Sequence, residues 1–77
     1  MANTIQISCF NGQAIAVFGL GRSGVSVAHA LIAGGADVRA WDDSDASRAS
    51  ATAENIPLVD LYSSDWSDIA ALVISPG

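Results

Sequence analysis

The sequence contains no lysine. It has three arginines and eight acidic residues, which gives a formal net charge of −5. A basic groove for nucleic acid, or a basic face for an anionic membrane, is hard to build from this composition. The missing lysine also excludes a Walker A phosphate loop and a Schiff-base enzyme from this chain. Any phosphate ligand must therefore be held mainly by backbone amides.

Cysteine and long apolar runs are scarce as well. Cys9 is the one cysteine, so neither an internal disulfide nor a zinc cluster of cysteines can form. The first arginine is Arg22, so the amino terminus lacks the basic region of a secretory signal. No apolar run approaches the roughly 20 residues needed to cross a bilayer. We therefore expect no membrane partner and a cytoplasmic location.

The apolar residues make up 51% of the 77 residues and fall into short runs, which indicates one small globular domain. Runs typical of strands cover residues 14–18, 36–41, 57–61 and 70–74, and helical spacing covers residues 23–33 and 46–54. Alternating strands and helices predict an α/β, Rossmann-like three-layer fold with a parallel sheet in the order 3-2-1-4. Residues 1–13 are expected to be a lead-in to a domain at residues 14–77.

The end of the chain suggests a truncated doubly wound domain. It stops at the carboxyl end of a strand, where such a sheet would normally continue into another helix. We interpret the chain as a piece of a larger protein. Its fourth strand would be an exposed edge, which invites self-association with another copy.

The most informative motif is Gly-x-Gly-x-x-Gly, which follows the first strand and opens the first helix. Gly19 permits the tight turn, Gly21 lets a phosphate approach the backbone, and Gly24 allows close packing of helix on strand. Unpaired amides at the helix start make an anion site, to which Arg22 and Ser23 can contribute. The motif in this context predicts a nucleotide or diphosphate site.

Two aspartates end the second strand, and Asp42 lies 18 residues after the third glycine of the motif. An acidic residue about 20 residues on meets a ribose hydroxyl in dinucleotide sites. Either Asp42 or Asp43 can face the ligand, and a helix-capping role is the alternative for Asp42. The other acids are too scattered for a metal site, so we expect none.

The segments 17–24, 40–43 and 74–77 together resemble the amino-terminal domain of the Mur ligases. In that family this domain has a Rossmann-like sheet that binds the UDP end of the muramoyl substrate. The resemblance implies a UDP site at the glycine loop, the two aspartates and the closing tripeptide: Gly21, Arg22, Ser23, Gly24, Asp42, Asp43, Ser75, Pro76 and Gly77. Ser44 departs from the family pattern, because some members carry a basic residue there, near the uracil.

The resemblance also implies a reaction for the intact parent enzyme, in peptidoglycan-precursor synthesis. ATP phosphorylates the carboxylate of UDP-N-acetylmuramoyl-L-alanine, and the amine of D-glutamate attacks the acyl phosphate. The parts that would hold ATP, Mg²⁺ and D-glutamate lie outside this chain. We therefore expect it to bind the UDP substrate, to hold no cofactor or catalytic residue of its own, and to be inactive alone. The alternatives are an NAD-binding domain of a dehydrogenase and a regulatory nucleotide-sensing module.

Overall fold

The computed structural model describes residues 6–75, so Pro76 and Gly77 of the predicted site lie outside the described residues. Its helices and strands alternate along the chain: β1 (Ala14–Phe18), α1 (Arg22–Ala33), β2 (Asp37–Trp41), α2 (Asp45–Ala53) and β3 (Ile69–Ile74). The first and last residues of each element differ by at most one position from those predicted from the sequence. The alternation confirms an α/β, Rossmann-like unit.

The element boundaries follow from local chemistry. The residues of β1 are apolar throughout, and all but Phe18 are buried, as expected for a central strand. Gly34 caps the end of α1, and the helix stops there because Gly35 has a φ of +91° and the amide of Ala36 donates back to the carbonyl of Leu31. Ser44 begins α2, since its hydroxyl accepts a hydrogen bond from the amide of Ser47.

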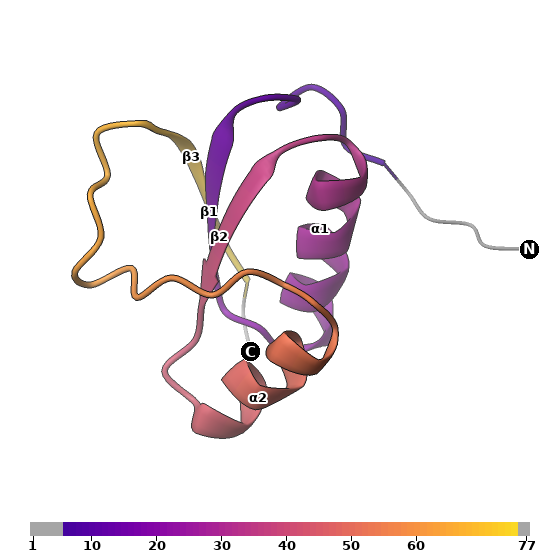
Figure 1. The fold of residues 1–77 in the computed structure, drawn as a ribbon. Helices are drawn as coiled ribbons and strands as arrows, with labels where there is room; N and C mark the ends of the chain where they lie inside the picture. Colours follow the sequence, from indigo (N-terminus) through magenta and orange to yellow (C-terminus); the bar gives the residue numbers. More distant parts are fainter. Residues whose placement is uncertain (1–5, 76–77) are drawn as a thin grey trace, which may run out of the picture.

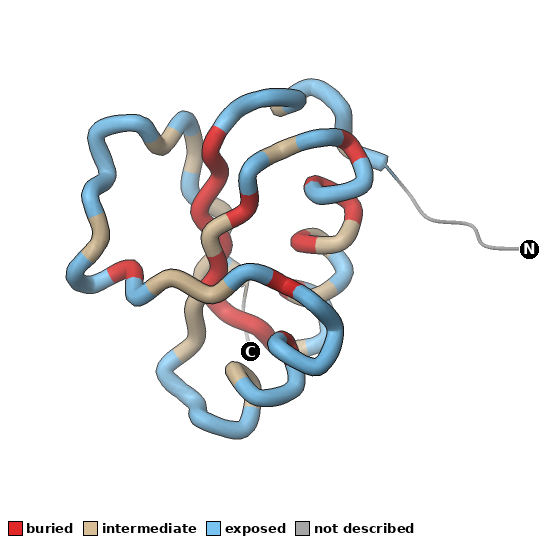
Figure 2. The backbone as a smooth tube through the Cα atoms, in the orientation of Figure 1, coloured by how far each residue is buried: buried red, intermediate tan, exposed pale blue. Residues whose placement is uncertain are grey.

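The three strands form one parallel sheet in the order β2-β1-β3. Both helices pack on the same face (Figure 1), where the buried core includes Ile15, Val17, Leu31 and Val38. Buried positions concentrate on β1 and on the facing sides of β2 and α1, whereas α2 is mostly exposed (Figure 2). At the carboxyl edge of the sheet, Phe18 is the register partner of Trp41 and of Ile74.

The predicted strand at residues 57–61, and with it the four-strand order 3-2-1-4, is wrong. The segment reaches the expected side of β2 but forms a single parallel bridge, between Leu58 and Ala40. The amide of Ala40 donates to the carbonyl of Pro57, and the amide of Val59 donates to the carbonyl of Ala40. Pro57 has no amide hydrogen to extend the ladder, and at Asp60 the chain turns, because its carboxylate accepts from the amide two residues later.

The three-layer arrangement is also wrong for residues 6–75, because the second face carries no helix there. Residues 57–68 cross this face as turns and irregular chain (Figure 1). Asp and Ser side chains predominate here and favour local turns, as where Asp65 accepts from the Ser67 amide. Arg39 on β2 anchors the end of the crossing with two hydrogen bonds to Asp68, of 2.9 and 2.8 Å.

The described part of the lead-in packs beside the end of α1. The amide of Ile7 donates to the carbonyl of Ala30, and the amide of Gly12 donates to the carbonyl of Gly35. The boundary at residue 13 stays a prediction. Among the helices that the structure describes, none has the length and apolarity needed to span a bilayer.

Candidate functional site

The glycine loop joins β1 to α1, and its first glycine makes the turn. Gly19 has a φ of +104°, in the region that favours glycine, and its amide donates to the carbonyl of Trp41 at 2.9 Å. A Cβ at this position would lie 2.3 Å from the carbonyl oxygen of Ser75. The turn predicted for Gly19 is therefore confirmed, and a second reason for glycine is the close approach of β3.

The third glycine lets α1 pack against the loop. A Cβ on Gly24 would lie 1.8 Å from the carbonyl oxygen of Gly19, which is a backbone atom with little room to move. The close packing predicted for Gly24 is confirmed. The role predicted for Gly21, close approach of a phosphate, stays a prediction; Gly21 is the N-cap of α1, with a φ of −67°.

The start of α1 is suited to an anion. Gly21 has no side chain to accept hydrogen bonds from the first amides of the helix, and the first turn carries no acidic residue. These amides have no partner inside the helix, and the helix dipole places partial positive charge there. Arg22 and Ser23 are exposed at this end. Backbone amides and one guanidinium are thus available to a phosphate in a chain without lysine.

Asp42 connects the glycine loop to the loop between β2 and α2. One carboxylate oxygen accepts from the amide of Leu20 and the other from the amide of Ser44, each at 2.7 Å. These two bonds, above all the one from Leu20, hold the pKa of Asp42 below its usual value. The carboxylate therefore stays ionised and keeps the two loops side by side.

Asp43 has a different partner. Its carboxylate accepts from the hydroxyl of Tyr62, at 2.9 and 3.2 Å, and this bond raises the pKa of Tyr62. The ring of Tyr62 meets the ring of Phe18 edge-on, with centroids 5.9 Å apart. Sequence reasoning missed Tyr62 because no local motif marks it and it lies 19 residues from its partner.

Ser75 reaches the glycine loop because β3 lies beside β1. Its amide donates to the carbonyl of Phe18 at 2.9 Å, and its Cβ would lie 3.3 Å from a Cβ on Gly24. The Ser75 hydroxyl oxygen is buried and has no hydrogen-bond partner within the described residues. The structure thus brings Ser75 together with the glycine loop. Its predicted role at the UDP-sugar stays a prediction.

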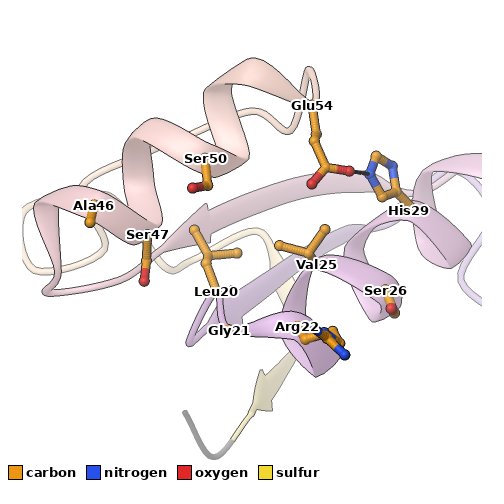
Figure 3. A pocket seen from close by; sticks show the side chains of 10 residues that line it. All are labelled: Leu20, Gly21, Arg22, Val25, Ser26, His29, Ala46, Ser47, Ser50 and Glu54. Carbon is orange, nitrogen blue, oxygen red and sulfur yellow. Dashed lines mark hydrogen bonds and ion pairs between the residues drawn. The ribbon is translucent and has the colours of Figure 1, made fainter.

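A cleft of about 510 Å³ lies between α1 and α2. It begins at Gly21 and Arg22, beside the glycine loop, and reaches the pair His29–Glu54, whose Nε2 and Oε1 are 3.0 Å apart (Figure 3). The remaining lining residues are Leu20, Val25, Ser26, Ala46, Ser47 and Ser50. The other predicted residues that the structure describes, Ser23, Gly24, Asp42, Asp43 and Ser75, do not line this cleft.

A smaller hollow of about 300 Å³ lies on the opposite face of the sheet and is almost entirely apolar. It is lined by Phe18, Leu61, Tyr62, Trp66, Leu72 and Ile74. No group of three or more His, Cys, Asp or Glu side chains suited to a metal ion occurs within residues 6–75. Of the two hollows, the cleft between the helices is the one lined by residues of the glycine loop.

A parallel α/β unit with a glycine loop opening its first helix defines the chain as a Rossmann-like domain fragment. Over 73 residues, 95% of this chain, it is 56% identical to the UDP-N-acetylmuramoylalanine--D-glutamate ligase of Caulobacter sp. (strain K31). The ligases of the same name from Phenylobacterium zucineum and Bartonella henselae are 51% and 48% identical over the same share of the chain. The chain is homologous to part of the UDP-N-acetylmuramoylalanine--D-glutamate ligases, which confirms the resemblance to the Mur ligases.

The chain spans 16% of the length of these relatives. No family model matches it, and no solved structure does.

Proposed function

We propose that the chain is the UDP-binding part of the amino-terminal domain of a cytoplasmic, ATP-dependent ligase that adds D-glutamate to UDP-N-acetylmuramoyl-L-alanine in peptidoglycan-precursor synthesis. The observation that carries the proposal is the glycine loop at the start of α1, braced by Asp42, in a chain homologous to these ligases. The proposed ligand of this chain is the UDP portion of the substrate.

The diphosphate lies over the amides that follow Gly21. The first turn of α1 offers it free N–H groups and partial positive charge, and Arg22 can pair with its oxygens. The buried hydroxyl of Ser75 has no hydrogen-bond partner within residues 6–75, which supports a polar ligand group at this place, because a buried hydroxyl is normally hydrogen-bonded. Pro76 and Gly77 follow directly and complete the proposed border of the UDP-sugar.

The nucleoside extends from the loop toward α2. The mouth of the cleft combines the apolar side chains of Leu20 and Val25 with the hydroxyls of Ser26 and Ser47, as ligand sites combine apolar walls with a few polar groups. Asp42 and Asp43 do not line the cleft but directly follow β2, and in this proposal they supply acceptors for ribose or base N–H and O–H groups. In this proposal the backbone amides bind the diphosphate, and the hydroxyl and carboxylate groups bind the nucleoside.

Catalysis is proposed to belong to the rest of the ligase. The chain has no lysine to hold an ATP phosphate, and ATP and Mg²⁺ are assigned to other domains of the parent enzyme. We expect the pure chain to release no ADP from ATP in the presence of UDP-N-acetylmuramoyl-L-alanine, D-glutamate and Mg²⁺. Measurable ADP release would contradict this assignment.

An NMR titration of the ¹⁵N-labelled chain tests the ligand. UDP is expected to shift the amides of Gly21, Arg22, Ser23 and Asp42 more than NAD does at equal concentration. Binding should be weak, because a ligand covered on one side only stays largely hydrated. Shifts with NAD that equal or exceed those with UDP at these residues would favour a dehydrogenase domain instead.

A further inference from the structure

Arg48, the fourth residue of α2, contacts the end of β2, the loop that follows it and the first residue of α2. Its guanidinium carbon lies 4.6 Å from the centre of the Trp41 ring. Its Nη1 donates to the carbonyl of Asp42 at 2.6 Å, and its Nη2 pairs with the carboxylate of Asp45. The side chain is only 23% exposed. Arg48 therefore holds the end of β2 and the start of α2 at once.

These contacts depend on the shape of the side chain as well as on its charge. A guanidinium is a flat group that can stack on an aromatic ring while its N–H groups donate in the plane. An ammonium group has no flat face, so lysine cannot make the stacking and the in-plane donation together.

The loop under Arg48 is the one that the proposed nucleoside would meet. Its residue Asp42 carries the bonds to Leu20 and Ser44, and Ser44 in turn caps α2. A bond to the carbonyl of Asp42 therefore restrains the residue that joins this loop to the glycine loop. Ser44 itself supplies no charge at this edge, so Arg48 is the cation that α2 brings here.

We propose that Arg48 is a positioning residue for the nucleoside half of the ligand. It fixes the conformation of residues 42–45 before the ligand binds, so that binding does not include the entropic cost of ordering this loop. The diphosphate half, held by the start of α1, does not depend on it. This inference rests on the proposed function, and it predicts that losing Arg48 separates the affinity for UDP from the affinity for the diphosphate group alone.

The test compares wild type with Arg48→Met, Arg48→Lys and a control, Arg39→Met, by NMR titration with UDP and with pyrophosphate. Arg39 is a matched control because its side chain is also 23% exposed and ion-paired, but to Asp37 and Asp68. Arg48→Met and Arg48→Lys are each expected to weaken UDP binding about tenfold, the worth of one or two lost hydrogen bonds, while pyrophosphate binding stays within about twofold. Arg39→Met should change neither.

The ligand-free protein gives a second measurement. Hydrogen exchange should quicken in Arg48→Met at the amide of Ser44, which donates to Asp42, and at the amide of Ser47, which donates to Ser44. It should not quicken at the first amides of α1 after Gly21, which make no bond to residues 42–45. Unchanged UDP affinity, full rescue by lysine, equal loss of UDP and pyrophosphate, or unchanged exchange would each overturn the inference. Failure of the wild type to bind UDP would instead overturn the proposed function.

Discussion

At the scale of single residues, Asp42 links two loops of the candidate site, a role that its place at the end of a strand does not indicate. One carboxylate accepts two backbone amides that lie on different loops, from Leu20 and Ser44. An asparagine is nearly the same size but offers only one oxygen, so one of these amides would lose its acceptor. Holding both amides therefore requires a side chain of this size with two acceptor oxygens.

Asp42→Asn is expected to lower the free energy of unfolding at pH 7 by about 1 kcal/mol. The folded pKa of Asp42 is depressed, so its contribution is complete above the unfolded value of about 3.9 and is lost as the pH falls through the folded pKa. Urea unfolding of the variant between pH 7 and pH 2 should therefore show a weaker loss of stability below about pH 4 than in wild type.

Asp43→Asn is the control for this series, since Asp43 accepts from the exposed Tyr62 hydroxyl instead of from backbone amides. Its stability at pH 7 should change little. Equal effects of the two substitutions on stability and on its pH dependence would show that the amide bonds to Asp42 are not responsible.

At the scale of elements, two glycines of one motif have separable roles. Gly24→Ala would place a methyl group against the backbone oxygen of Gly19, and α1 would have to move off β1. We expect a loss on the order of 1–3 kcal/mol in the free energy of unfolding. Gly21→Ala should cost less, about 0.5–1 kcal/mol, because its φ of −67° suits alanine although glycine is the better N-cap, but it should weaken UDP binding. Thermal unfolding and UDP titration of both variants separate the two effects.

A Gly21→Ala protein that binds UDP normally would contradict a diphosphate site at this loop. A Gly24→Ala protein as stable as wild type would contradict the packing role of Gly24. In the full-length ligase, the Gly21 change should appear mainly as a raised KM for the UDP substrate.

The short helix α2 depends on its N-cap. Ser44→Ala removes the hydroxyl that accepts from the Ser47 amide and should lower the free energy of unfolding by about 1 kcal/mol. Ser50→Ala is the control, since Ser50 is exposed inside the same helix, and it should be neutral or slightly stabilising. Chemical denaturation measures both, and a larger effect at Ser50 would exclude the capping explanation.

At the scale of the whole molecule, β3 is the edge of the described sheet, and its outer face exposes Leu72 and Ile74, 46% and 70% respectively. Such an edge favours pairing between copies, whereas the net charge of −5 opposes it. We expect the sedimentation-equilibrium mass to rise with protein concentration, and more so at high salt, which screens the repulsion. Leu72→Lys should keep the chain monomeric without unfolding it.

A wild-type mass that stays monomeric at high salt and millimolar concentration would contradict pairing through β3. The circular dichroism spectrum of Leu72→Lys is the control for its fold.

Much of the fold was predictable because its signals are local. Continuous apolar runs marked β1 and β3, helical spacing and a closing glycine marked α1, and the glycine motif marked the turn between β1 and α1. The prediction of a strand at residues 57–61 was wrong, because an apolar run does not show how many backbone hydrogen bonds the segment will form with the adjacent strand β2. With Pro57 at its start and a turn at Asp60, only Leu58 bridges β2.

By itself, the sequence determined the order of elements, the glycine loop and the acidic end of β2, since each depends on residues close together in the chain. Only the tertiary structure decided which groups meet across longer separations. The carboxylate of Asp42 binds the amide of Leu20 across 22 residues, and Tyr62 binds Asp43 across 19. Parallel pairing of β1 with both neighbours gathers the carboxyl ends of the strands at one edge, and that juxtaposition, which no local pattern encodes, forms the candidate site.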